Sequence, residues 1–183
     1  MKKILFILQF SLAACTFSQS QEWAARYNGP AGNNEDYARS ITIDVSGNVY
    51  VTGYSNGIGT GSFDYATVKY NSAGVQQWAV RYNGPGNGTD YAFSIAVDGS
   101  RNVYVTGASI GSGTDYDYAT IKYDSSGIQQ WVSRYHGPGG GQDFARSIAV
   151  DGSGNVYVTG GSPGSGTSID YTTIKYNSIG TQQ

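Results

Sequence analysis

A sequence unit of about 53 residues recurs along this chain, and this repetition constrains the fold more than any other feature. The hexapeptide Asn-Val-Tyr-Val-Thr-Gly occurs at Asn48–Gly53, Asn102–Gly107 and Asn155–Gly160. A second shared segment, Asp-Tyr-x-Thr-x-Lys-Tyr, returns with the same step, and its lysines are Lys69, Lys122 and Lys175. A repeat of this length indicates one supersecondary unit stacked several times, each copy burying apolar surface against the next.

Each unit contains four strand-like stretches separated by turn residues. In the second unit these stretches are Ala92–Asp98, Asn102–Ala108, Tyr118–Tyr123 and Gln129–Tyr135. Tyr, Val, Ile and Thr within them favour strands, whereas the Gly, Ser and Asp between them favour turns. The pattern predicts an all-β fold of β-propeller blades, each a four-stranded antiparallel sheet.

The first stretch of each unit is predicted to be the innermost strand of its blade, and these strands include Ile41, Ile95 and Ile148. In the second unit small residues alternate with bulky ones: Ala92, Ser94 and Ala96 against Phe93, Ile95 and Val97. Strict alternation places the two sets on opposite faces of the sheet. Both faces are then expected to pack against neighbouring blades.

The repeated segment resembles a known family. Ser147–Gly160 is similar to the bacterial SBBP β-propeller repeat and, more distantly, to the NHL repeat. The resemblance extends from Trp23 to Gln183. It implies exported or surface proteins, and it carries no catalytic residues over to this chain.

The repeats divide the chain into an N-terminal signal at residues 1–20 and β-propeller repeats at residues 21–183. Within the repeats we expect an outer strand at 22–28, blades at 36–82 and 90–135, and a partial blade at 143–183. Propellers use four to eight blades, so these repeats predict an incomplete propeller whose parent chain continues. The open arc is expected to self-associate through its exposed edge unless residues 22–28 fold back to complete the last blade.

The N-terminus has the pattern of a secretory signal. Lys2 and Lys3 precede an apolar stretch, Ile4–Ala14, which is too short to span a bilayer. Processing before Gln21 is one expected outcome, and lipidation of Cys15 at a lipobox-like sequence is the other. Either outcome predicts an exported protein, extracellular or on the outer cell surface, with a lipid anchor in the second case. No later segment is apolar enough to cross a membrane.

Charge and cysteine content exclude several function classes. The 11 basic and 13 acidic residues give a net charge of −2, and no basic run offers a footprint for nucleic acid. The single Cys rules out an internal disulfide.

One set of repeated carboxylates invites a calcium hypothesis. Asp44, Asp98 and Asp151 each open a Gly-containing turn. A helix–loop–helix calcium loop needs Gly at its sixth position and Glu at its twelfth. Counted from Asp151, those positions hold Val156 and Ser162. We therefore predict that the three Asp residues are structural turn caps and bind no metal.

Other polar residues also recur at equivalent positions. Two carboxylate sets are expected near a channel rim and at the start of the third strand: Asp36, Asp90 and Asp143, and Asp64, Asp117 and Asp170. The repeated basic residues are expected to lay their aliphatic stems along blade faces: Arg26, Arg81 and Arg134, and Lys69, Lys122 and Lys175. His136 replaces Asn28 and Asn83 in a loop and is predicted to be a neutral substitution.

These features predict no catalytic residue and no cofactor. The expected function is that of a non-enzymatic exported or cell-surface scaffold or interaction module, with an unidentified protein or glycan as ligand. One alternative is an adhesive or glycan-binding propeller that uses the variable loops at 87–89 and 139–142. A second alternative is a non-catalytic part of a larger secreted enzyme.

Overall fold

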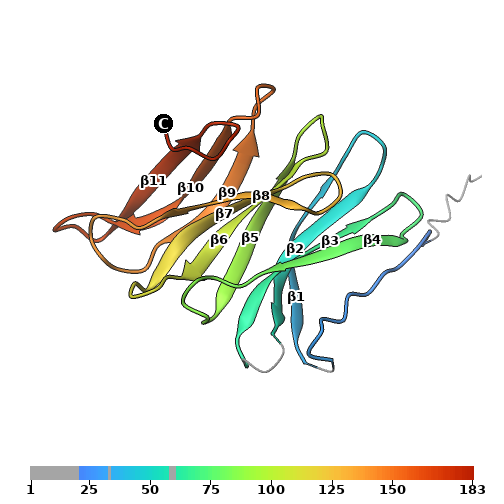
Figure 1. Cartoon of the computed structure of the whole chain (residues 1–183), viewed down its shortest axis with the longest axis horizontal. Coiled ribbons are helices and arrows are strands. Elements are labelled where there is room, and N and C mark those ends of the chain that lie inside the picture. Colours follow the sequence, from blue (N-terminus) through green and yellow to red (C-terminus); the bar gives the residue numbers. More distant parts are fainter. Residues whose placement is uncertain (1–20, 33, 58–60) are drawn as a thin grey trace, which may run out of the picture.

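A computed structural model describes residues 21–32, 34–57 and 61–183. The described residues form eleven strands and no helix, arranged in three antiparallel sheets (Figure 1). The first sheet holds β1 (Asp36–Ile43), β2 (Val49–Asn56), β3 (Phe63–Tyr70) and β4 (Gln76–Tyr82). The second holds β5 (Asp90–Val97), β6 (Val103–Ile110), β7 (Tyr116–Tyr123) and β8 (Gln129–Tyr135). The third holds β9 (Phe144–Val150), β10 (Val156–Pro163) and β11 (Ile169–Tyr176).

Each sheet is an up-and-down meander in which strands adjacent in sequence pair in space. Strand β5 packs against β1, β2 and β3 of the preceding sheet, and β9 packs against β5, β6 and β7. The first strands thus lie together at the inside of the arc, and the later strands fan outward. This arrangement confirms the prediction of consecutive propeller blades. The expected signal at residues 1–20, including Cys15, lies outside the described residues.

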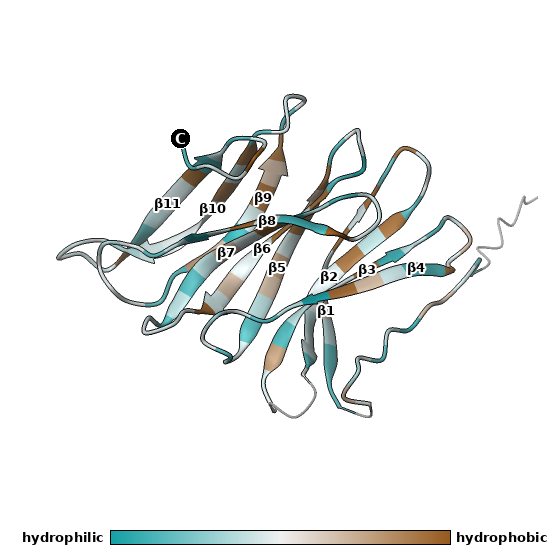
Figure 2. Cartoon of the chain, in the orientation of Figure 1, coloured by the Kyte–Doolittle hydropathy of each residue, from teal (hydrophilic) through white to brown (hydrophobic). Residues whose placement is uncertain are grey.

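Two apolar cores lie at the blade junctions, where side chains of one sheet meet the next sheet. Figure 2 shows apolar bands along the strands between polar ones. The first core joins Tyr50 and Tyr65 of the first sheet to second-sheet residues that include Ala92, Val105 and Ile121. The second core repeats this arrangement between the second and third sheets. Stability therefore depends on face-to-face blade packing, because burial of apolar surface is the main favourable contribution to folding.

The predicted alternation along the innermost strand is interrupted. The pairing of β5 with β6 shifts between Ala92 and Ser94, which marks a bulge at Phe93. Because a bulge inserts one extra residue, the side chains after it change face. Ala92 and Ile95, expected on opposite faces, therefore both lie in the first core.

The segment at 22–28, predicted to be an outer strand, makes no strand pairing. A strand needs a neighbour to hydrogen-bond with, and no third strand of a preceding blade lies beside it among the described residues. The segment runs along the first sheet, at the opposite end of the arc from the C-terminus (Figure 1). The Trp23 ring lies 6.3 Å from that of Tyr70 in β3. It therefore does not fold back onto the third sheet.

Candidate functional site at the blade junctions

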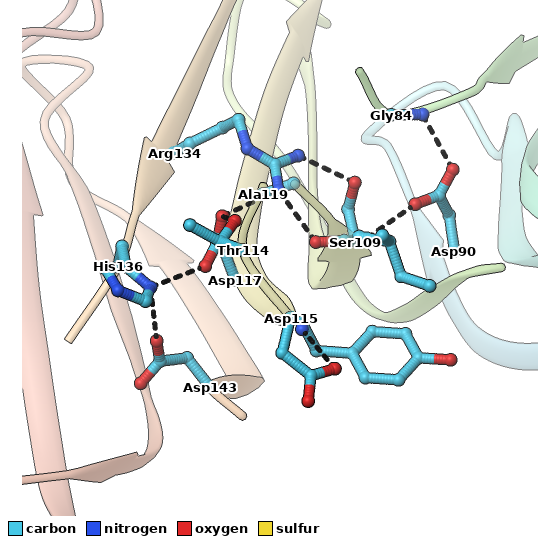
Figure 3. Close-up of polar contacts among 12 residues, drawn as sticks. Gly84, Asp90, Ser109, Thr114, Asp115, Asp117, Ala119, Arg134, His136 and Asp143 are labelled. Atoms are coloured by element: carbon cyan, nitrogen blue, oxygen red, sulfur yellow. Dashed lines mark hydrogen bonds and ion pairs between the residues drawn. The ribbon is translucent and has the colours of Figure 1, made fainter. Parts of the chain in front are cut away.

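The second blade contains a buried ion pair at one end of its outer strands (Figure 3). The Arg134 Nη2 atom of β8 lies 3.0 Å from Asp117 Oδ2 of β7. The same guanidinium donates to both the hydroxyl and the backbone carbonyl of Ser109 in β6, at 2.7 Å each. Arg134 thus ties together the three outer strands of the blade. Burial acts to lower its pKa, but hydrogen bonds to Asp117 and Tyr82 outweigh this and raise the pKa.

The first blade repeats this arrangement. Arg81 Nη2 lies 3.0 Å from Asp64 Oδ2 and 2.6 Å from the Ser55 carbonyl oxygen. The sequence analysis predicted only that the aliphatic stems of these arginines pack along the blades. The ion pairs with Asp64 and Asp117 were not predicted. Their partners lie 17 residues away in sequence, and only the β3–β4 and β7–β8 pairing brings them together.

A second carboxylate anchors the loop that connects one blade to the next. The Gly84 N–H donates to Asp90 Oδ2 at 2.7 Å, and the Ile110 N–H donates to Asp90 Oδ1 at 3.1 Å. Asp90 is fully buried, and this burial raises its pKa although hydrogen bonds act to lower it. Asp36 and Asp143 hold Gly29 and Gly137 in the same way.

His136 joins this polar cluster at the junction of the second and third blades (Figure 3). Its Nδ1 atom lies 2.9 Å from Asp117 Oδ1 and 3.7 Å from Asp143 Oδ2. The sequence analysis predicted that His136 is a neutral loop substitution, and it did not predict the contact of His136 with Asp117. The available signal was the position of His136 two residues after Arg134, on the connection that passes beside Asp117.

Asp117, His136 and Asp143 offer three potential metal-ligand atoms within 4.8 Å of one another. However, Asp117 Oδ2 already accepts hydrogen bonds from Arg134 and Thr114, and Asp143 Oδ2 accepts one from the Gly137 N–H. The adjacent guanidinium also disfavours a cation at this place. Asp143 Oδ1 is buried and has no hydrogen-bond partner among the described residues, whereas the other carboxylate oxygens of Asp117 and Asp143 are engaged, so the cluster has mainly the chemistry of a hydrogen-bonded ion network.

The turn carboxylates lie at the other end of the first two strands. Asp98 Oδ1 accepts the N–H groups of Ser100 and Asn102 at 2.9 and 2.8 Å. Its Oδ2 accepts the Asn102 amide at 2.7 Å and the Tyr104 hydroxyl at 2.9 Å. Asp44 and Asp151 receive the same four bonds. Asp98 therefore holds its turn and the start of β6 together.

These bonds predict a dependence of stability on acid pH. Burial acts to raise the pKa of Asp98, but hydrogen bonds from Asn102, Tyr104 and Ser100 outweigh it and lower the pKa below 3.8. A lowered folded-state pKa stabilises the fold above the unfolded pKa, and this stabilisation is lost as pH falls through the folded value. We expect urea denaturation to show Asp98→Asn less stable than the unmodified protein at pH 7, with the difference shrinking below about pH 4. A difference independent of pH would contradict this role.

This chain is a β-propeller repeat protein. Its antiparallel sheets repeat along the sequence, the first strand of each sheet lies innermost, and equivalent contacts join each blade to the next. The family model of the SBBP β-propeller repeat matches residues 22–59, 77–113 and 130–166. The chain belongs to this family. The second and third matched ranges begin in the outer strands β4 and β8 and cross into the following blade, and the first begins in the equivalent segment at 22–28, so the family unit includes the junction.

Two individual proteins are also similar. An uncharacterised WD repeat-containing protein of Acanthamoeba polyphaga mimivirus is 27% identical over 154 residues, which cover 72% of this chain. The matched region spans only 10% of that viral protein. A fucose lectin from Kordia zhangzhouensis, solved with methyl-fucoside, is 11% identical, with a TM-score of 0.41 over 75% of this chain and 91% of the lectin. In the described part of the chain, no helix is long and apolar enough to cross a membrane.

Proposed function

We propose that this chain is a non-enzymatic segment of an exported or cell-surface protein and acts there as a scaffold or interaction module. The observation that carries the proposal is the repeated junction between blades. The Tyr65 hydroxyl donates to the Ala119 carbonyl at 3.3 Å, and the equivalent Tyr118 hydroxyl donates to Thr172 at 3.4 Å. Trp78 and Trp131 likewise donate from their indole N–H groups to the next blade, at 3.1 and 3.2 Å.

The charged residues of the described chain support a structural role. The turn carboxylates accept four hydrogen bonds each, and the junction carboxylates hold Gly N–H groups or arginines. General acid–base or nucleophilic catalysis needs a group positioned toward a substrate and tuned for proton transfer. Carboxylates that are engaged in this way by internal hydrogen bonds and ion pairs instead fix the geometry of the blades, although Asp64 Oδ1 and Asp143 Oδ1 are buried without a hydrogen-bond partner among the described residues. A rigid stack of this kind suits a protein that presents surfaces to partners.

Export is tested by expressing residues 1–183 in a Gram-negative host. We expect a processed protein outside the cytoplasm, because Lys2–Lys3 and Ile4–Ala14 have the pattern of a secretory signal. Intact-mass measurement distinguishes Gln21 as the first residue from a lipid-modified Cys15. Protease treatment of intact cells then shows whether the blades reach the outer surface. Unprocessed protein retained in the cytoplasm would overturn the proposed location.

The non-enzymatic part is tested on the same purified protein. Ester, glycoside and phosphate substrates are assayed with the unmodified protein and with His136→Asn, which introduces the residue found at positions 28 and 83. We expect no turnover by either protein. Turnover that His136→Asn abolishes would place catalysis at the junction cluster and refute the proposal.

A further inference from the structure

A polar groove of about 560 Å³ lies between the second and third blades. Its walls come from the turn between β5 and β6 and the turn between β9 and β10, which lie side by side (Figure 1). Tyr104, Lys122 and Ser178 complete the lining. The volume is within the roughly 300–1,000 Å³ that is typical of small-molecule sites. The groove belongs to an interior junction, and both of its walls are among the described residues.

The equivalent place at the first junction is next to an arginine instead of a glycine. Arg101 is the repeat equivalent of Gly47 and Gly154. All three residues have a positive φ: 65° at Arg101, 76° at Gly47 and 78° at Gly154. This backbone region favours glycine, so an arginine is held there against its conformational preference. The three turns therefore share one backbone and differ in whether a side chain leaves it.

The side chain at this turn position determines whether the groove is open. A Cβ at Gly154 would lie 3.4 Å from the Ser178 Cβ atom and 4.0 Å from the Tyr104 hydroxyl, so a longer side chain there would enter the groove. At the first junction, burial and the hydrogen bond to Asp44 raise the pKa of Tyr50, the equivalent of Tyr104, whereas the nearby charge of Arg101 acts to lower it. Arg101 thus lies close to the place that Gly154 leaves open.

The charged groups of the groove favour a neutral ligand. Asp98 and Asp151 line it, and each accepts four hydrogen bonds from its own turn and the following strand. A carboxylate has about four lone-pair sites, so a metal ion would have to displace these bonds. The two negative charges exceed the single positive charge of Lys122, and this balance disfavours an anion.

The remaining groups of the groove can bind hydroxyl groups. Lys122 Nζ donates to the Ser178 carbonyl at 3.3 Å and lies 5.3 Å from the centre of the Tyr104 ring. An ammonium has three N–H donors, so two remain for a ligand. Val97 and Val150 add apolar surface, which can contact the C–H groups of a ring. Three further lining residues carry hydroxyls that both donate and accept: Ser100, Ser153 and Ser178.

We propose that this groove binds a neutral saccharide. A sugar ring offers hydroxyl donors and acceptors around its edge and C–H groups on its faces, which match the polar lining and the two valines. A peptide would instead add a strand to a free sheet edge or insert an apolar anchor into a pocket, and a groove of turns and polar side chains provides neither. The inference rests on the proposed role as an interaction module and names the ligand class of one site in it.

The first test is binding of the purified full chain to an array of immobilised neutral and acidic saccharides, followed by calorimetry with the neutral sugars that bind. We expect one site per chain. Gly154→Arg should abolish binding, because it places in the groove a side chain that the same turn already carries at Arg101. Gly47→Arg is the matched control. It makes the same substitution at nearly the same φ, outside the groove, and should leave binding unchanged.

Two further variants test the groove without adding a side chain to it. Arg101→Gly should open the equivalent place at the first junction and raise the stoichiometry from one site to two. Lys122→Met keeps the length of the stem and removes the ammonium donors, so it should weaken binding roughly tenfold or more. Its matched control is Lys69→Met, which removes the equivalent ammonium at the first junction and should leave the affinity unchanged.

Urea denaturation first establishes that each variant is folded, and Lys122→Met decides the matter if Gly154→Arg is not. The inference would be overturned by binding to no neutral saccharide, by binding to acidic saccharides alone, or by binding that these two variants leave unchanged. A stoichiometry that stays at one in Arg101→Gly would overturn the equivalence of the two junctions. None of these outcomes depends on export or on the absence of catalysis, so failure here leaves the proposed function standing, with a protein as its ligand.

Discussion

Replacing Gly107 with alanine should unfold the middle blade. A Cβ at this position would lie 1.9 Å from the Tyr91 carbonyl oxygen and 2.8 Å from the Ala92 Cα atom. Both contacts are with the backbone of β5, so a change of side-chain rotamer cannot relieve them. The strand would have to move away at the bulge between Ala92 and Ser94, where β5 and β6 pair. We expect a loss of about 4 kcal/mol or more, comparable with much of the 5–15 kcal/mol that stabilises a typical domain.

Gly99→Ala is the matched control for this substitution. A Cβ at Gly99 meets no atom within 4 Å, and its φ is not in the left-handed region. We expect a change within about 0.5 kcal/mol. Urea denaturation followed by circular dichroism and by Trp fluorescence measures both variants. Similar midpoints for the two would show that the strands can separate at Gly107 without cost.

The blade architecture could be predicted because its signals are local. Turn residues such as Gly127, which has a φ of 85°, fall between stretches of β-branched and aromatic residues at every repeat. The step of the repeat then places equivalent strands at equivalent positions in each sheet. The expectation that Ile41, Ile95 and Ile148 lie on innermost strands followed from this regularity, and β1, β5 and β9 contain them.

The details that went unpredicted depend on pairing between strands. Strict alternation misplaced Ile95, because the bulge at Phe93 is set by the register of β5 against β6. The segment at 22–28 has the residues of an outer strand, but strand structure needs a partner as well as a favourable sequence. The pattern of a single sequence specifies neither the register in which two strands pair nor which strand lies beside a given segment.

The junction cluster was missed for a similar reason. His136 contacts Asp117 across 19 residues of sequence, and Asp143 approaches from the following blade. The repeats show which of these positions hold the same residue in every unit and which differ, but they do not show which side chains are in contact. Arg134 and Asp117 are a fixed pair only because β7 and β8 are antiparallel neighbours with Ala119 opposite Arg134.

Removing the arginine of this pair should cost nearly as much as disturbing the backbone. In Arg134→Ala, Asp117 keeps a side chain that is only 6% exposed, while its strongest hydrogen-bond donor is lost. Breaking a buried ion pair by removing one partner costs about 3–5 kcal/mol, because the other charge remains desolvated. Since Arg134 is itself 22% exposed, we expect about 3 kcal/mol, the lower end of that range. Ser109 would also lose the donor to its hydroxyl.

A double-mutant cycle separates the pair from the rest of the blade. Asp117→Asn keeps the shape of the side chain and removes its charge, so the double variant with Arg134→Ala leaves no buried charge behind. We expect the double variant to be more stable than the sum of the two single effects predicts, by about 1–3 kcal/mol for groups in direct contact. Arg101→Gly, at an exposed turn, should change stability little and controls for loss of positive charge. Additive effects in urea denaturation would mean that Arg134 stabilises the blade through Ser109 and the packing of its stem, and that the ion pair itself contributes little.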